Sequence, residues 1–379
     1  MSENWIAPDQ LFDGKSVVSG HALRIVDGKV ADLAPAPHAA VPIKGCLTPG
    51  FVDLQVNGGG GVMLNSAPAR DSMVTIAAAH RTFGTVAIMP TVITDAADVL
   101  DRAADAVLAA RQDDGIVGLH IEGPHISVAR RGTHNGANIR KLDDRTMNVV
   151  QMLRQHGVAV MITVAPEAAT NTQIATLAAL GAVVSIGHTD ATADAVEAAI
   201  AAGASCATHL FNAMSPMTGR GPGAVGAIIN SDMRSGIICD GHHVDDRMIR
   251  LAIRARPKDD LMFLVSDAMA TVGGPDHFDL YGQGVHLKEG RLINAEGGLA
   301  GAHITQAEGV ARLVHHVGIP LDHALRMAVT IPAQVIGRDD LASLVGRKTR
   351  DLVVLSNNLA QADALNAMLG ATLAYDAAE

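Results

Sequence analysis

Residues 183–214 read VVSIGHTDATADAVEAAIAAGASCATHLFNAM. A short apolar run stands at each end of this segment, and the residues between the runs, 190–202, are Ala-rich with Val and Ile at helical spacing. Thr189 or Asp190 can cap the amino end of such a helix, and Gly203 can end it. The segment therefore predicts a strand, a helix and a second strand.

Each of the two apolar runs ends on a histidine, His188 in the first and His209 in the second. In a parallel barrel the carboxyl ends of the strands lie on one face, and active sites are built on that face. Two imidazoles brought together there suggest a metal site, because neutral histidine is a common metal ligand.

The alternation of strand and helix extends from Thr48 to Asp267, with helical periodicity between most strands, as in Ala96–Arg111. Repeated βα units favour an α/β fold with a TIM-type (β/α)8 barrel over an open Rossmann sheet. A doubly wound sheet is the structural alternative, because a sequence cannot show closure. A further hairpin, Val285–Leu287 with Leu292–Asn294, is predicted beyond the barrel strands. The eight predicted strands are Gly50–Asn57, Thr85–Val92, Ile116–Glu122, Val158–Ala165, Ala182–His188, Ser205–Phe211, Gly236–Asp240 and Leu261–Asp267.

Strand-rich segments flank the barrel on both sides. The first has a hairpin signal at Asp27-Gly28, and the last has a clear strand at Asp351–Leu355. We expect both to join in one small β-sandwich domain. The predicted domains are therefore residues 1–48 and 336–379 for the β domain and 49–335 for the barrel.

The composition limits the classes of function. A formal charge of -10 disfavours a general role in binding nucleic acid or an anionic membrane. Cys46, Cys206 and Cys239 all lie in apolar runs, so we expect buried free thiols and a reducing compartment. The start of the chain lacks a signal pattern, and no apolar run is long enough to span a bilayer. We therefore expect a soluble cytoplasmic protein.

Acidic residues join the two histidines at the predicted strand ends. Glu122 ends the third strand and Asp267 ends the eighth. Glu122, His188 and His209 make a three-ligand set for zinc that leaves a position for water, whose pKa such a metal lowers to about 7. Asp267 can then accept the water's proton and return it to a leaving group. Any one of these residues alone more often has a structural role, but four on equivalent strand ends favour a catalytic site.

Sequence spacing alone does not decide the roles of two other features. One of His242 and His243 can reach a substrate, and the sequence does not choose between them. Arg220 stands at the head of a Gly-rich loop. An arginine with exposed backbone amides suits a phosphate or a carboxylate, and a solvated surface arginine is an equally good interpretation.

Several motifs occur in a fixed order along the chain. They are Pro49–Gly58, His120–Pro124, Arg131–Asn135, Ala165–Glu167, Gly187–Thr189, Thr208–Met214, Asp240–His243, Ser266–Ala268 and Leu299–Gly301. Single motifs are weak, whereas the ordered set is highly specific. Together they resemble the amidohydrolase superfamily and, within it, the N-acetylglucosamine-6-phosphate deacetylase family.

The resemblance implies a reaction and a set of site residues. The reaction is metal-dependent hydrolysis of N-acetyl-D-glucosamine 6-phosphate to D-glucosamine 6-phosphate and acetate, in amino-sugar metabolism. The implied metal ligands are Glu122, His188 and His209, and the implied catalytic carboxylate is Asp267. His134 would help to polarise the acetyl carbonyl. The implied substrate contacts are Thr133, His134, Asn212, Ala213, Arg220, Asp240, His243, Leu299, Ala300 and Gly301.

The resemblance also bears on the phosphate end and on the number of metals. Arg220 and His243 would hold the phosphate, and in this family a phosphate contact can come from the neighbouring subunit of a homodimer. Gln55 and Asn57 stand where many superfamily members carry a His-x-His motif for a second metal, and neutral amides are poor zinc ligands. We therefore expect one divalent metal per subunit, either zinc or ferrous iron.

Two alternative functions are retained. One is an amidohydrolase that acts on another N-acylated sugar phosphate or on a cyclic amide. The other is a non-catalytic barrel that only binds, which would be expected to have lost a metal ligand or Asp267. All four residues are present, so the binding protein ranks lowest.

Overall fold

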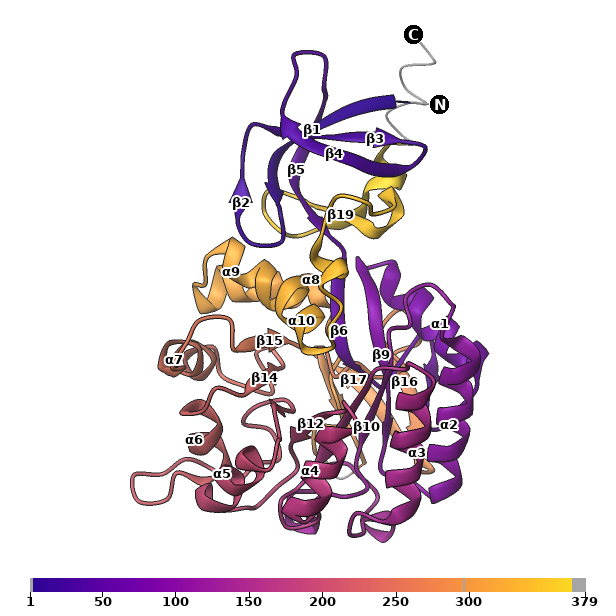
Figure 1. Cartoon of the computed structure of the whole chain (residues 1–379), viewed down its shortest axis with the longest axis vertical. Coiled ribbons are helices and arrows are strands. Elements are labelled where there is room, and N and C mark those ends of the chain that lie inside the picture. The colour runs from indigo at the N-terminus through magenta and orange to yellow at the C-terminus, as the bar shows by residue number, and fades with distance from the viewer. Residues whose placement is uncertain (1–2, 296, 370–379) are drawn as a thin grey trace.

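Eight parallel strands form the central sheet of the molecule (Figure 1). The structure is a computed structural model that describes residues 3–295 and 297–369. Neighbouring strands follow one another in sequence order around the sheet. The strands are β6 (Phe51–Val56), β9 (Thr85–Ile93), β10 (Leu119–Glu122), β11 (Val160–Val164), β12 (Val183–Ile186), β13 (Cys206–Ala207), β14 (Arg234–Ile237) and β15 (Met262–Leu264).

The first and last strands of this sheet come together and close it into a barrel. A parallel bridge joins Val56, at the end of β6, to Ala268, which follows β15. The amide of Asp267 donates to the Gln55 carbonyl at 3.0 Å, and the amide of Asn57 donates to the Ala268 carbonyl at 2.9 Å. The predicted TIM-type barrel is therefore confirmed, and the open-sheet alternative is wrong.

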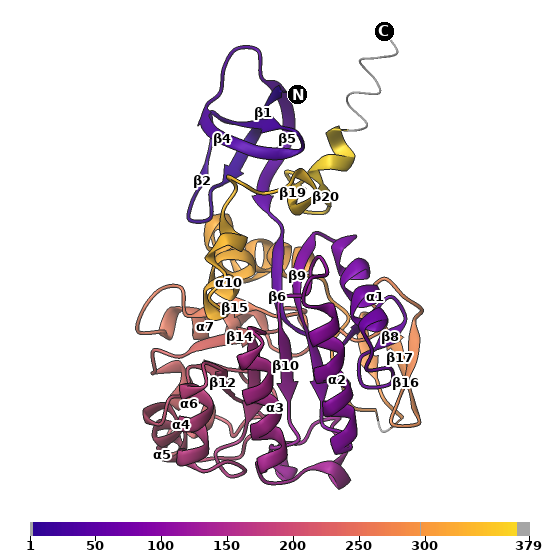
Figure 2. The same ribbon diagram turned by 45° about the vertical axis from the view of Figure 1, so that its right-hand side comes forward.

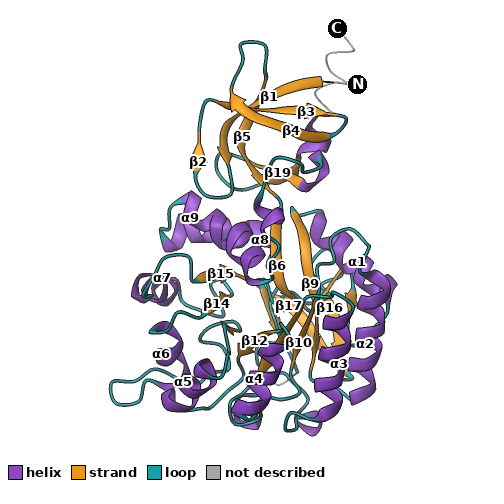
Figure 3. Ribbon diagram, viewed as in Figure 1, coloured by secondary structure: helices purple, strands orange, loops and turns teal. Residues whose placement is uncertain are grey.

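Helices cover the outside of the barrel strands (Figure 3). The helix after β12 begins later than predicted, because Thr192 caps it and accepts from the amide of Ala195. The two predicted caps are engaged elsewhere, since the Thr189 hydroxyl accepts from the Ala191 amide and donates to Glu167, and the Asp190 carboxylate accepts from Arg130. The helices are α1 (Arg70–Arg81), α2 (Ala97–Ala110), α3 (Asp144–Gln155), α4 (Asn171–Ala179), α5 (Ala193–Ala201), α6 (Gly223–Ile229), α7 (Asp246–Ala255), α8 (Gln306–Arg312), α9 (Leu321–Leu325) and α10 (Ile331–Val335).

The two ends of the chain join in one seven-stranded sheet above the barrel (Figure 1). Strand β5 lies between β1, to which it is parallel, and β19, to which it is antiparallel. The predicted β domain from both terminal segments is confirmed, while its boundaries at residues 48 and 336 stay predictions. Residues 1–2 and 370–379 of that prediction lie outside the described residues. The strands are β1 (Glu3–Phe12), β2 (Val17–Val18), β3 (His21–Val26), β4 (Lys29–Pro35), β5 (Val41–Pro49), β19 (Leu352–Leu355) and β20 (Ala362–Ala364).

The predicted hairpin beyond the barrel is part of a three-stranded antiparallel sheet. It consists of β16 (His277–Leu280), β17 (Gln283–Lys288) and β18 (Arg291–Ile293). Its apolar side chains form a separate small core that includes Met63 and Met269 of the barrel mouth. Figure 2 shows this sheet beside the small hairpin strand β8 (Val62–Met63), on the side of the barrel near α1.

None of the helices in the described ranges is long and apolar enough to cross a membrane. The three cysteines are buried and free, as predicted.

Gly45 is the glycine of the β domain that a side chain would disturb most directly. Its φ is +112°, and an added Cβ would stand 2.2 Å from the Leu355 carbonyl oxygen of the neighbouring strand β19. Gly20 is a matched control, because its φ is also positive and an added Cβ would meet nothing within 4 Å. Both alanine variants strain the backbone, but only Gly45→Ala also forces two strands apart. We expect Gly45→Ala to lower the free energy of unfolding by about 1–3 kcal/mol more than Gly20→Ala.

Chemical denaturation followed by circular dichroism measures this difference. Equal losses in the two variants would contradict the close approach of β5 and β19.

Candidate active site

Four side chains from different strand ends converge at the mouth of the barrel. Glu122 is the last residue of β10, and His188, His209 and Asp267 follow β12, β13 and β15 within three residues. The Nε2 atoms of His188 and His209 lie 3.2 and 3.0 Å from Glu122 Oε1 and 3.1 Å from each other. All four side chains are buried. The structure thus brings together the residues that the sequence assigned to the metal and to proton transfer.

The donor set around Glu122 fits a divalent cation. Nδ1 of His188 lies 2.9 Å from the carbonyl oxygen of Arg130, which can only accept, so the proton of the neutral ring resides on Nδ1. The lone pair of Nε2 then faces a carboxylate oxygen of Glu122 at 3.2 Å. Two acceptors repel each other at this distance unless a cation lies between them. A carboxylate with two imidazoles is also a ligand set that zinc accepts.

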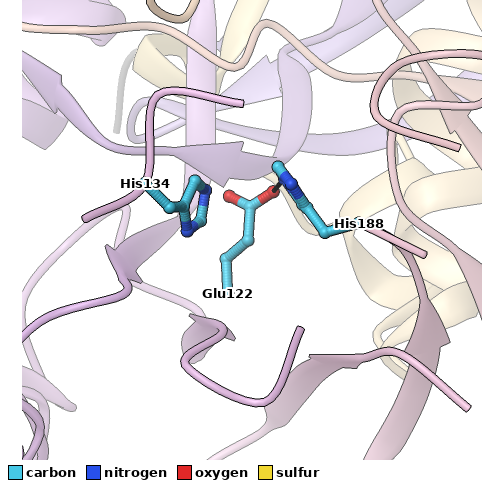
Figure 4. A group of neighbouring side chains, drawn as sticks. All are labelled: Glu122, His134 and His188. Carbon is cyan, nitrogen blue, oxygen red and sulfur yellow. Dashed lines mark hydrogen bonds and ion pairs between the residues drawn. The ribbon is translucent and has the colours of Figure 1, made fainter. Parts of the chain in front are cut away.

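His134 lies on the other side of the same carboxylate (Figure 4). Its ligand atoms, with those of Glu122 and His188, all lie within 4.8 Å of one another, so distance alone would admit it to the metal set. The ring is 4.3 Å from that of His188, and its Nδ1 lies 2.7 Å from Thr94 Oγ1. Burial lowers the pKa of His134 to about 3, so the ring is neutral near pH 7.

The side-chain amides of Gln55 and Asn57, in β6 and just after it, hydrogen-bond to the carboxylates of the site. Gln55 Nε2 donates to both oxygens of Glu122 at 3.0 Å and to Asp267 Oδ1 at 3.1 Å. Asn57 Nδ2 donates to the same Asp267 oxygen at 2.7 Å. These two side chains therefore provide the hydrogen bonds that orient both acids.

The two carboxylates have different proton affinities. Burial acts to raise the pKa of Glu122, but the nearby imidazoles of His188 and His209 outweigh burial and hold that pKa well below the usual value. Burial, followed by the charge of Glu122, raises the pKa of Asp267 to about 6. A carboxylate with a pKa near the working pH suits proton transfer, whereas one that stays ionised suits a cation.

The backbone is left-handed at three of the four convergent residues. The φ angles are +46° at His188, +30° at His209 and +51° at Asp267. Such values are rare outside glycine. Strands β12 and β13 consequently end before the histidines, whereas the sequence predicted strands that ran through them. The turn at each strand end directs the side chain toward the common centre.

A cavity of about 180 Å³ opens over this centre. Seven predicted substrate contacts line it, together with Asn57, Ile93, Gly132 and Met269. The seven are Thr133, His134, Asn212, Ala213, His243, Leu299 and Gly301. His243, not its exposed neighbour His242, is the member of that pair that reaches the cavity.

Three predicted substrate contacts do not line the cavity. Arg220 is exposed on the loop before α6. Asp240 lies behind His243, with Oδ2 2.6 Å from Nδ1 of that ring, so it orients the imidazole. Ala300 is fully buried, and its amide donates to the carbonyl of Leu292. The sequence also missed Thr94, which stands just beyond β9 and could have been found by the same strand-end argument.

A closed parallel barrel with this site at the carboxyl ends of its strands defines a class of hydrolase that holds a metal. The amidohydrolase family model matches residues 46–371, and the chain belongs to that family. The N-acetylgalactosamine-6-phosphate deacetylase of Shewanella sp. (strain ANA-3) is 40% identical over 89% of this chain and 88% of its own. The crystal structure of N-acetylglucosamine-6-phosphate deacetylase from Pasteurella multocida matches with a TM-score of 0.87 and 35% identity, over 95% of this chain and 97% of its own.

A mutant of N-acetyl-D-glucosamine-6-phosphate deacetylase from Mycobacterium smegmatis, solved in complex with N-acetyl-D-glucosamine 6-phosphate, also has a TM-score of 0.87. Its identity is 30%, over 96% of this chain and 97% of its own.

Proposed function

We propose that this chain hydrolyses N-acetyl-D-glucosamine 6-phosphate to D-glucosamine 6-phosphate and acetate, in the breakdown or recycling of amino sugars. The observation that carries the proposal is the meeting of Glu122, His188, His209 and Asp267 under one cavity. The names of the similar proteins supply the substrate class, an N-acetylated hexosamine 6-phosphate. Free, buried cysteines are compatible with the cytoplasm as the site of the reaction.

Glu122, His188 and His209 are the residues that would hold one divalent cation, with zinc preferred and ferrous iron as the alternative. A cation there supplies Lewis acidity, which makes hydroxide available near neutral pH and polarises a carbonyl. Gln55 donates its N–H groups to Glu122 and Asp267, so it orients both carboxylates, and a neutral amide oxygen is a poor zinc ligand. We therefore expect one metal per chain.

Asp267 moves the proton in the proposed reaction. Its Oδ1 already accepts from Gln55 and Asn57, which leaves Oδ2 to take the proton of the attacking water. The water oxygen bonds to the acetamido carbon, and His134 donates a hydrogen bond to the carbonyl oxygen as negative charge develops there. The carbon–nitrogen bond then breaks, and Asp267 gives its proton to the departing amine.

The remaining cavity residues would bind the sugar phosphate. His243, oriented by Asp240, lines the cavity, as do Asn212 and Ala213, and we assign these residues to the phosphate end. Arg220 is exposed and away from the cavity of its own chain. We propose that it reaches the phosphate of a neighbouring subunit in a homodimer.

An assay of acetate release with parallel metal analysis tests this function. We expect hydrolysis of N-acetylglucosamine 6-phosphate with about one metal per chain, and a large loss of kcat/KM for N-acetylglucosamine without its phosphate. N-acetylgalactosamine 6-phosphate is the second candidate substrate, because the relative from Shewanella has that name. No acetate from either sugar phosphate would overturn the proposal, and a need for two metals per chain would overturn the single-metal site.

A further inference from the structure

Thr94 stands behind His134 and is completely buried. Its Oγ1 lies 2.7 Å from Nδ1 of the histidine. Within residues 3–295 and 297–369, this is the one hydrogen bond that the Thr94 hydroxyl makes. The direction of this bond determines which nitrogen of His134 carries the proton.

Only one direction satisfies every group. If Nδ1 donated to the hydroxyl, the buried threonine O–H would be left without an acceptor among the described residues, which is unfavourable. If the hydroxyl donates to Nδ1, the bond is complete and the proton of the neutral imidazole resides on Nε2. The free N–H of His134 is then on the nitrogen that faces away from Thr94.

His188 has the opposite arrangement, although its ring lies 4.3 Å from that of His134. Its Nδ1 faces the carbonyl of Arg130, which can only accept, so Nδ1 keeps the proton and Nε2 presents a lone pair. Two neighbouring histidines thus become a ligand and a donor, because Nδ1 of one faces a carbonyl and Nδ1 of the other faces a hydroxyl.

We propose that Thr94 is a positioning residue that makes His134 a hydrogen-bond donor to the substrate carbonyl and keeps it out of the metal set. The inference rests on the proposed function for the identity of that carbonyl. Keeping His134 from binding the metal matters, because its ring nitrogens are close enough to Glu122 and His188 to share a cation with them.

Two further residues hold Thr94 in place. The Tyr281 hydroxyl, from the turn between β16 and β17, donates to the Thr94 carbonyl at 2.5 Å. Gly123 leaves room for the hydroxyl, since an added Cβ there would stand 2.2 Å from Thr94 Oγ1. The three-stranded sheet beside the barrel mouth is therefore linked to the orientation of His134.

Kinetics of three variants test the proposal. Thr94→Val keeps the shape and removes the hydroxyl, so we expect kcat to fall about 10- to 100-fold, with KM and metal content nearly unchanged. Thr94→Ser restores the donor and should recover most of kcat. Thr85→Val is the matched control, because Thr85 is buried at the opposite end of β9 and its Oγ1 has no partner among the described residues. That variant should keep the wild-type kcat.

A second measurement does not depend on catalysis. In metal-free protein with ¹⁵N-labelled histidine, NMR distinguishes protonated from bare ring nitrogens, and the His134 signals are assigned by their absence in His134→Gln. We expect the Nε2–H form in the wild type and in Thr94→Ser, and a shift toward Nδ1–H in Thr94→Val. An Nδ1–H form in the wild type, or a Thr94→Val variant with wild-type kcat and tautomer, would overturn the inference. A wild type that is inactive on every sugar phosphate but has the expected tautomers would instead refute the proposed function alone.

Discussion

Asp267→Asn is expected to lower kcat for acetate release by about 10³-fold while the protein keeps its metal and its substrate affinity. The asparagine can place its oxygen where Oδ1 now accepts from Gln55 and Asn57, so the local hydrogen bonds survive. Its amide nitrogen, in the position of Oδ2, cannot accept a proton. The variant therefore loses proton transfer while it keeps binding, and the effect appears as a lower kcat.

Steady-state kinetics and metal analysis on the same preparation measure this effect. Asp194→Asn is a suitable control, because Asp194 is exposed on α5 and lies outside the cavity lining. It should retain most of the activity. Turnover near the wild-type value in Asp267→Asn would remove Asp267 from the mechanism.

His209→Ala is expected to abolish metal retention. His209 Nε2 lies within 3.1 Å of both the Glu122 carboxylate and the second imidazole, so its loss leaves two donors where the cation needs three. We expect metal content to fall from about one per chain to near zero after dialysis. Activity should fall by more than the roughly 10- to 100-fold that follows loss of a residue that only supports a ligand.

His242→Ala provides the comparison, since His242 is exposed next to His243 and outside the cavity lining. It should keep both metal and activity. A His209→Ala protein that retains a full equivalent of metal would mean that His134 can serve as the third ligand, contrary to the role inferred for Thr94.

The barrel and most of its site could be predicted because their signals are local. Each strand is a short apolar run, and the polar residue that ends it, such as Glu122 or Asp267, reaches the shared face by the geometry of parallel strands. Strand β16, His277–Leu280, was not predicted from the sequence.

The parts that sequence reasoning missed depend on partners from distant segments. Thr189 could cap a helix, but its hydroxyl accepts from the Ala191 amide and donates to Glu167, and Thr192 caps α5 instead. Thr94 acquires its role only because the loop that carries His134 folds back onto the end of β9. Likewise, the left-handed φ angles at the two histidines could not be predicted from the strand-like runs that precede them.

The left-handed backbone at these residues lowers the stability of the fold while it serves catalysis. Histidine and aspartate with positive φ carry unfavourable backbone energy that the surrounding barrel must offset. Glycine would relieve this energy at the same positions, yet it supplies neither an imidazole nor a carboxylate. A barrel with glycine at these positions would therefore have a lower backbone energy but would lack the side chains that the reaction needs. Catalysis keeps the strand ends at a higher backbone energy than the fold alone requires.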